Sequence, residues 1–231
     1  TTKNALQGYT GTVRANASTL GSFGGGGYVS MKAGKFGITA NYGYNYRNSP
    51  WNDSYSERFT DEDMLADGNP TRLEEKGRSK NKGPFQYGYL EGSYEIDTLN
   101  LLSVGVNLFR GKNKSLSELD AVLDPLDGID NRLRSYDPVY RYNRNSVSEG
   151  TFGSTDINVD FQHSTSKKDE LLTLSYRFSQ SPNDNEGRTE VDVQEGYYYL
   201  SGEYPKWNIN DASTVEHTGQ VDYTTPLFEK Q

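Results

Sequence analysis

The stretch Phe36–Tyr46, FGITANYGYNY, alternates along its whole length between two kinds of side chain. Every second position from Phe36 onward is apolar or aromatic, and the positions between are Gly, Thr or Asn. Because side chains of a strand point alternately to opposite faces, this pattern predicts a strand with one apolar and one polar face. Its 11 residues match the roughly 9–11 that a tilted strand needs to cross a bilayer core. A half-buried strand of a soluble sandwich shows the same alternation, so this stretch alone leaves both structures open.

The 231-residue chain is polar overall but rich in aromatic rings. Hydrophobic residues make up 32% and the mean hydropathy is −0.86, whereas aromatics reach 13%, with 18 tyrosines. The aromatic content argues against a disordered chain. A transmembrane barrel accommodates both facts, because each strand needs only one apolar stripe while the lumen and loops are polar. The chain has no run of about 18 apolar residues, so the sequence predicts no membrane-spanning helix.

Three further features exclude whole classes of function. The absence of cysteine removes disulfides, thiolate catalysis and cysteine metal sites. A formal net charge of −8 argues against a nucleic-acid-binding surface, which needs a basic patch. No signal peptide begins the sequence and both ends look cut, so we expect a segment of a longer protein.

The alternating patterns predict about eight strands joined by connections of very unequal length. The predicted strands are 6–17, 28–32, 36–46, 85–96, 99–110, 151–163, 171–180 and 215–225, and the predicted long loops are 47–84, 111–150 and 181–214. Short turns, such as Ala33–Gly34–Lys35 and Asp97–Thr98, alternate with these long polar connections. Long structureless loops are uncommon in compact domains. Outer-membrane barrels, in contrast, join strands by short turns on one side and long loops on the other.

Some details within this pattern are less regular. In the loop 111–150, the spacing of Leu116, Leu119 and Val122 predicts a short helix that ends near Gly128. The glycine-rich stretch 18–27 lacks the lysine and helix of a phosphate-binding loop, so we interpret it as a reversal or strand start. The apolar phase of 85–96 is blurred by Tyr87 and Tyr89, which either a bulge or lumen-facing tyrosines would explain.

The clear stripes carry no Lys or Arg, each of which costs about 2–4 kcal/mol on a lipid-facing surface at mid-bilayer. The fold predicted is therefore all-β, an antiparallel meander forming one domain over 1–231 that is part of a large transmembrane barrel. The residues predicted to face lipid are Phe36, Ile38, Tyr42, Tyr44, Leu102, Val104, Val106, Leu108, Leu172, Leu174, Tyr176 and Phe178.

Several short sequence motifs occur in the order in which they are found in one protein family. These motifs are Leu6–Tyr9 before the glycine-rich reversal, Lys35–Phe36, Tyr42–Arg47, Gly92–Tyr94, Asp97–Leu99, Asn158–Phe161 with His163, Glu216–Thr218 and Val221–Tyr223. Together they resemble the start of the barrel in TonB-dependent outer-membrane receptors, within the outer membrane protein β-barrel family. The resemblance spans essentially the whole chain, although no single motif is diagnostic.

This resemblance implies a barrel of about 22 strands closed by a separate plug. About the first third of that barrel corresponds to the present chain, and we expect the plug and the TonB-contacting box to lie N-terminal to it. The implied location is the outer membrane of a Gram-negative bacterium, with lipid, a nutrient ligand and, through the plug, TonB as partners. Open edges of such a segment would invite pairing with another copy.

Aromatic residues in the long connections are the candidates for ligand contact. Rings with a polar tip beside arginine suit capture of a polar ligand, although they also pack small loop cores. These candidates are Trp51, Tyr55, Tyr136, Tyr140, Arg141, Tyr142, Arg144 and Trp207, together with Tyr197–Tyr199. No cofactor or metal is expected, because Asp124, Asp127 and Asp130 depart from the EF-hand spacing and His163 and His217 have no ligand partners in the sequence.

Two hypotheses from different classes follow. The first is a transport receptor without enzymatic activity, whose external loops help to select a nutrient. The second is a soluble β-rich surface or adhesin-type module whose apolar stripes pack on one another. A sandwich would place the Phe36 stripe against the Leu102 or Leu172 stripe, whereas a barrel would set all three on one continuous surface.

Overall fold

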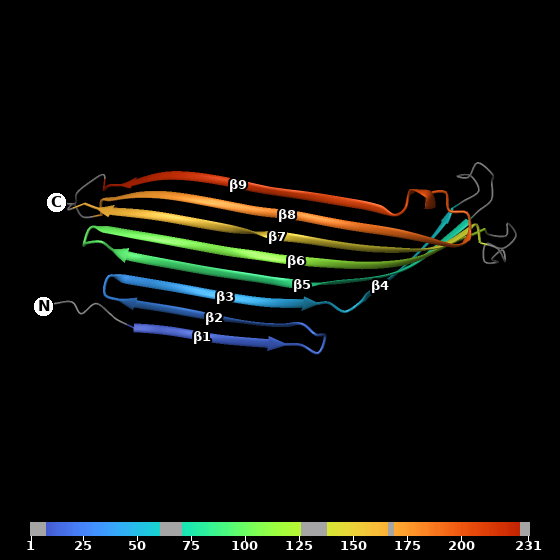
Figure 1. Cartoon of the computed structure of the whole chain (residues 1–231), viewed down its shortest axis with the longest axis horizontal. Coiled ribbons are helices and arrows are strands. Elements are labelled where there is room, and N and C mark those ends of the chain that lie inside the picture. The colour runs from blue at the N-terminus through green and yellow to red at the C-terminus, as the bar shows by residue number, and fades with distance from the viewer. Residues whose placement is uncertain (1–7, 61–70, 126–137, 166–168, 227–231) are drawn as a thin grey trace.

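The computed structural model describes residues 8–60, 71–125, 138–165 and 169–226, which build one antiparallel sheet of nine strands (Figure 1). The strands are β1 (Gly8–Ala17), β2 (Phe23–Ala33), β3 (Phe36–Asn48), β4 (Asn52–Thr60), β5 (Thr71–Glu95), β6 (Asn100–Pro125), β7 (Tyr140–Ser164), β8 (Leu171–Gly196) and β9 (Lys206–Thr224), with a 3-10 helix η2 (Ser201–Glu203) before β9. Neighbours in the sequence are neighbours in the sheet, except that β4 folds back on β5. The predicted all-β antiparallel meander is therefore confirmed, and the sheet is open, with β1 and β9 at its edges.

The short turns from β2 to β3 and from β5 to β6 lie at one end of the sheet, as the sequence predicts, whereas β1 and β2 are joined at the opposite ends of their strands (Figure 1). Gly34 turns β2 into β3 with a φ of 60°, a left-handed conformation that glycine adopts without steric cost. The carboxylate of Asp97 accepts hydrogen bonds from the backbone N–H groups of Leu99 (2.8 Å) and Asn100 (2.9 Å) and so closes the turn into β6. The hydrogen bond from the Leu99 N–H contributes most to lowering the pKa of Asp97 below its usual value, and the bond from the Asn100 N–H lowers it further.

The predicted long loops 47–84, 111–150 and 181–214 are wrong for most of their length. β5, β6, β7 and β8 continue unbroken from the predicted strands to 25 or 26 residues each, and β4 is an additional strand. The polar side chains there do not interrupt pairing, which continues along these strands apart from short gaps at Gly83–Pro84 between β5 and β6 and at Gly153–Ser154 between β7 and β8. Cross-strand ion pairs such as Arg78–Glu118 (2.6 Å) and Lys114–Glu149 (2.5 Å) accompany the ladder.

The short helix predicted after Ser115 is also wrong, because this segment belongs to β6 as far as Pro125. The helical spacing of Leu116, Leu119 and Val122 coexists with a two-residue alternation, and pairing with two long neighbouring strands decides in favour of the strand. The predicted end at Gly128 lies outside the described residues. The glycine-rich run Gly24–Gly27, interpreted as a reversal or strand start, lies within β2.

The sheet forms a single layer, and its three apolar stripes do not face one another. In register, Phe36 is opposite Tyr94, Tyr94 opposite Leu102, and Leu174 reaches the same row through Phe161. Within the described residues the buried hydrophobic side chains are those of Ala121 and Tyr142, both far from the stripes. The arrangement therefore differs from that of a sandwich, which would bury the stripes between two layers.

Candidate functional site

One face of the sheet carries a continuous apolar surface, built by register from one strand to the next. Directly paired residues share a face, so the Phe36 stripe of β3 continues sideways in both directions. We name as the apolar belt the alternate positions of this face within Tyr9–Ala17, Phe23–Ala33, Phe36–Tyr46, Gly88–Tyr94, Leu102–Leu108, Thr155–His163, Leu172–Gln180 and Val215–Tyr223. The belt contains no Asp, Glu, Lys or Arg in any of these ranges.

All twelve residues predicted to face lipid lie in the apolar belt. Their side chains remain accessible even though they are apolar, with Phe36 54%, Leu174 42% and Val104 40% exposed. Aromatic pairs span adjacent strands at both margins, for example Phe36–Tyr94 with ring centres 5.0 Å apart and Phe23–Tyr46 at 5.4 Å. A surface this wide and this apolar, without a covering layer among the described residues, is unusual for a protein face in contact with water.

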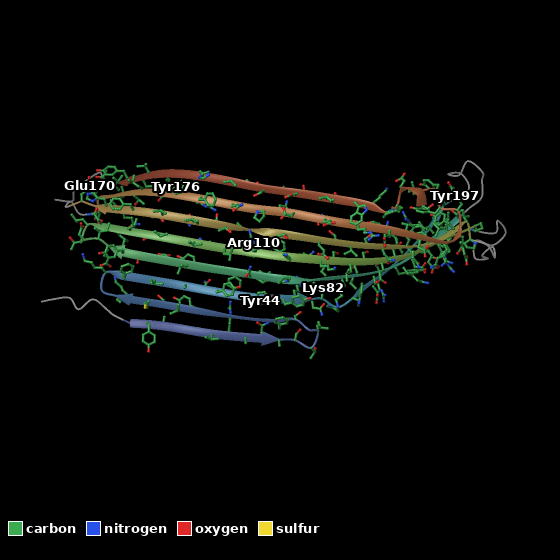
Figure 2. The ribbon with its side chains drawn as sticks, in the orientation of Figure 1. Tyr44, Lys82, Arg110, Glu170, Tyr176 and Tyr197 are labelled. Atoms are coloured by element: carbon green, nitrogen blue, oxygen red, sulfur yellow. The ribbon has the colours of Figure 1, made fainter. Side chains whose placement is uncertain are left out.

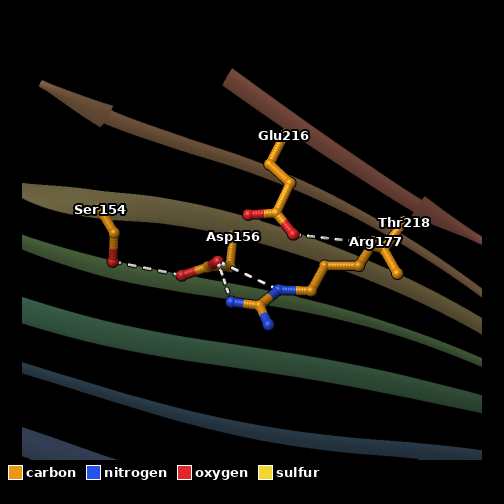
Figure 3. A network of polar contacts seen from close by, with 5 residues as sticks. All are labelled: Ser154, Asp156, Arg177, Glu216 and Thr218. Atoms are coloured by element: carbon orange, nitrogen blue, oxygen red, sulfur yellow. Dashed lines mark hydrogen bonds and ion pairs between the residues drawn. The ribbon is translucent and has the colours of Figure 1, made fainter. Parts of the chain in front are cut away.

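The opposite face, which we name the polar face, holds the charges of the same strand segments. Figure 3 shows Arg177 of β8 reaching Asp156 of β7, with Nη2 2.7 Å and Nε 3.3 Å from Oδ1, while Ser154 donates to Oδ2 at 3.2 Å. Glu216 of β9 accepts a hydrogen bond of 3.2 Å from Thr218 of the same strand (Figure 3). Charged side chains at the level of the belt are therefore present on the polar face, where Arg177 and Asp156 form an ion pair.

The apolar alternation of β5 is irregular around Tyr87 and Tyr89 because both tyrosines lie on the polar face. The register of β5 with β3 and with β6 is continuous from Phe85 to Tyr94, so no bulge is needed. Both tyrosines lie on the polar face, and the ring of Tyr87 covers Gly43 so closely that a Cβ there would lie 2.4 Å from its Cζ. Arg14 reaches over this ring to 5.8 Å from its centre.

The apolar belt ends abruptly on β5 and β6, where four cationic side chains follow. On β6, Arg110, Lys112 and Lys114 occupy the three positions of this face that follow Leu108, and on β5 Lys82 follows Gln86 and Pro84 on the same face. Figure 2 shows Lys82 midway along the sheet, and in register it is opposite Asn48, two residues beyond Tyr46 of the belt. The character of this face thus changes from apolar to charged while the hydrogen-bonded ladder continues.

Some of the residues predicted to contact a ligand lie together at the end of the sheet opposite the Gly34 and Asp97 turns. Tyr140 and Tyr142 of β7 pack with Tyr198 of the β8–β9 connection, at ring-centre distances of 5.2 and 4.3 Å. Tyr142 is only 6% exposed, and this burial, followed by the interaction with Tyr198, raises the pKa of its hydroxyl far above the usual value. Because Tyr142 is a packed residue on the polar-face side, these rings form a small core of the sheet end.

The remaining predicted candidates are spread over the two faces. Trp51 precedes β4, and the guanidinium of Arg78 lies 4.8 Å from its ring centre. Trp207 of β9 has an equivalent partner, Arg188, at 5.0 Å. By alternation Tyr55, Arg141 and Trp207 extend the face of the belt, whereas Tyr140, Tyr142 and Arg144 extend the polar face. Tyr136 lies outside the described residues.

Sequence reasoning missed the partners that hold these aromatic residues. Arg78 and Arg188 became visible as stacking partners only through the register of β4 with β5 and of β8 with β9. The row of cations beyond the belt was also missed, although its signal is present in the sequence. Arg110, Lys112 and Lys114 alternate directly after the Leu102–Leu108 stripe, and Lys80 and Lys82 alternate shortly before the strand that begins near Phe85.

No helix within residues 8–60, 71–125, 138–165 and 169–226 is long and apolar enough to cross a membrane. The same residues contain no group of three or more His, Asp or Glu side chains arranged to hold a metal ion. In comparisons with known proteins, no protein-family model matches the chain, and no curated protein shows significant sequence similarity to it.

Proposed function

We propose that the chain is a section of the wall of an outer-membrane barrel that belongs to a receptor for energy-dependent nutrient uptake. The observation that carries the membrane part is the uncharged apolar belt, which crosses eight strands on one face while ion pairs occupy the other. In lipid, such a belt is solvated by acyl chains and needs no second protein layer.

The dimensions of the belt support this proposal. From Phe36 to Tyr46 a strand rises about 34 Å at ~3.4 Å per residue. A strand tilt of about 40° reduces this length to a height of about 26 Å, close to the ~25 Å apolar band of outer-membrane barrels. The belt also starts and ends at different levels on β3 and β8, so it runs obliquely across the strands, as strand tilt in a barrel requires.

Orientation follows from the two unequal ends of the sheet. Short turns of outer-membrane barrels face the periplasm and long connections face the exterior. The end with Gly34 and Asp97 is therefore the periplasmic end, and the charged extensions of β5–β9 project outside the cell. The uptake role is supported by the resemblance of the short strand motifs to those of TonB-dependent receptors. In this proposal the plug is supplied by another part of the protein.

The absence of cysteine makes a direct topological test simple, since single cysteines can be introduced one at a time. Ser201→Cys in η2, Lys35→Cys in a short turn and Val106→Cys in the belt are exposed to a membrane-impermeant maleimide on intact cells. We expect labelling of the Ser201 variant on intact cells, labelling of the Lys35 variant only after the membrane is opened, and no labelling of the Val106 variant until the protein is denatured. Equal labelling of all three, or recovery of the protein in the soluble fraction, would refute the membrane assignment.

The uptake role needs its own experiment. Strains with and without the protein, each with and without TonB, are grown with iron, a glycan or a peptide as the limiting nutrient. We expect one nutrient to support growth only when both the protein and TonB are present. Equal growth of all four strains on every nutrient would refute the uptake role and leave the membrane assignment standing.

A further inference from the structure

A compact group of cations borders the apolar belt on β5 and β6. Lys82 and Lys114 are directly opposite each other in register, and Lys112 is two residues from Lys114 on the same face. Arg110 lies one step closer to the belt, opposite Gln86. Like charges in directly opposed positions destabilise a sheet, so this pairing has an electrostatic cost.

Carboxylates of the protein offset this charge only in part. Glu149 forms an ion pair with Lys114 at 2.5 Å, and this bond, with the nearby Lys112 and Lys82, lowers the pKa of Glu149. Among the described residues, no carboxylate lies within ion-pairing distance of Lys82 or Lys112. Farther along the same face, the first acidic residue is Glu74 on β5 and Glu118 on β6. The cluster therefore keeps an excess of positive charge at the margin of the belt.

Three members of the cluster, Lys82, Lys112 and Lys114, line one side of a groove of about 560 Å³, together with Glu149. Tyr46 and Pro84, at the margin of the belt, line its apolar end, and Asp184, Glu186 and Asp211 lie on the side of β8 and β9. An anion in this groove is repelled by those carboxylates and attracted by the lysines, so it belongs on the β5–β6 side. A molecule that combines an apolar chain with an anionic head matches both parts of the site.

We propose that Lys82, Arg110, Lys112 and Lys114 bind the phosphate groups of anionic lipid headgroups at the outer margin of the apolar belt. This inference rests on the proposed membrane location. The lysine stems lie along the margin while their ammonium groups reach the headgroup level, and the acyl chains cover the belt beside Tyr44 and Tyr46. The bound phosphates then offset the repulsion between Lys82 and Lys114.

The test uses the protein inserted in bilayers of phosphatidylcholine mixed with phosphatidylglycerol, followed by native mass spectrometry of the co-purified lipid. We compare wild type with Lys82→Gln/Lys112→Gln/Lys114→Gln, and with the control Lys76→Gln/Arg188→Gln/Lys206→Gln, which removes three positive charges far from the belt. We expect wild type and the control to retain phosphatidylglycerol preferentially. A basic residue at a membrane surface contributes about a fivefold preference, so we expect the cluster variant to lose roughly tenfold or more.

Each other outcome overturns the proposal. Unchanged preference in the cluster variant, or an equal loss in the control, shows that the cluster is not the lipid site. Displacement of the lipid by inorganic phosphate at equal concentration shows a free-phosphate site instead. Failure of wild type to enter bilayers refutes the membrane proposal as well, whereas insertion without any lipid preference refutes only this inference.

Discussion

Replacement of Val106 by arginine tests the apolar belt at its centre. Val106 lies between Leu90 of β5 and Ile157 of β7, with Leu102 and Leu108 toward the two margins on its own strand. An arginine on a lipid-facing surface near mid-bilayer costs about 2–4 kcal/mol. Since 1.36 kcal/mol corresponds to a factor of ten, the folding equilibrium should fall by roughly thirtyfold to nine-hundredfold.

The matched control is Asn107→Arg, because Asn107 is the next residue along β6 and lies on the polar face. A second control, Leu116→Arg, lies on the same face as Val106 but beyond the belt, among charged residues. Each control should cost about 0–1 kcal/mol, since neither arginine enters lipid. Reversible folding into lipid vesicles, followed during urea titration, measures all three free energies of unfolding. Equal losses for Val106→Arg and Asn107→Arg would refute the assignment of the two faces.

Two further predictions concern the backbone and one turn. Gly83 has a φ of 157°, and a Cβ there would lie 2.0 Å from the carbonyl oxygen of Lys112, so Gly83→Ala should lower the free energy of unfolding by about 1–3 kcal/mol. Gly92→Ala, with no atom within 4 Å of its Cβ, should change it by less than about 0.5 kcal/mol, and urea titration of both variants that gave equal losses would contradict this reasoning. Because folding lowers the pKa of Asp97 below its ordinary 3.8, the stabilisation of its turn is complete above pH 3.8 and disappears as the pH falls through the folded-state pKa. NMR shifts of the Leu99 amide should show this transition in wild type and not in Asp97→Ala, and a transition near neutral pH would contradict it.

The belt itself could be predicted from the sequence because lipid-facing and core-facing strands obey the same rule of alternation. The Phe36 stripe, the Leu102 stripe and the Leu172 stripe are all recovered on one face, and the short turns at Gly34 and Asp97 are recovered between the expected strands. The alternating pattern alone does not determine whether those stripes face lipid or a second layer of protein. Only the register, which places Phe36, Leu102 and Leu174 in one row, shows that they extend one surface.

The extensions of β5–β8 could not be predicted because most of their residues are polar, and an apolar alternation such as Leu119, Ala121 and Leu123 covers only a few residues. A stretch such as Arg78–Lys82 has no apolar phase, so its composition is typical of a loop, and the decisive interactions are backbone bonds to β6. Those bonds form only when the neighbouring strand has a similar length and polarity. This condition depends on both strands together, so the sequence of one strand does not reveal it. The aromatic candidates do not form one site, because the register places Tyr142 and Trp207 on opposite faces of the sheet. The sequence alone does not contain this register.

In the proposed membrane location, side chains and not the backbone ladder fix the height of the protein in the bilayer. The register of β5 with β6 is the same on both sides of the belt margin, although Gly83 and Pro84 have no partner on β6, and β6 pairs with β7 across this margin without a gap. Backbone pairing of β6 therefore does not distinguish lipid from water there. The distinction is made by side chains on one face alone, at the step from Leu108 to Arg110. The cation cluster therefore marks the margin of the belt on these strands. Charges introduced two residues nearer the turns should shift that margin toward the periplasm without changing the sheet, because the pairing that builds the sheet is independent of it.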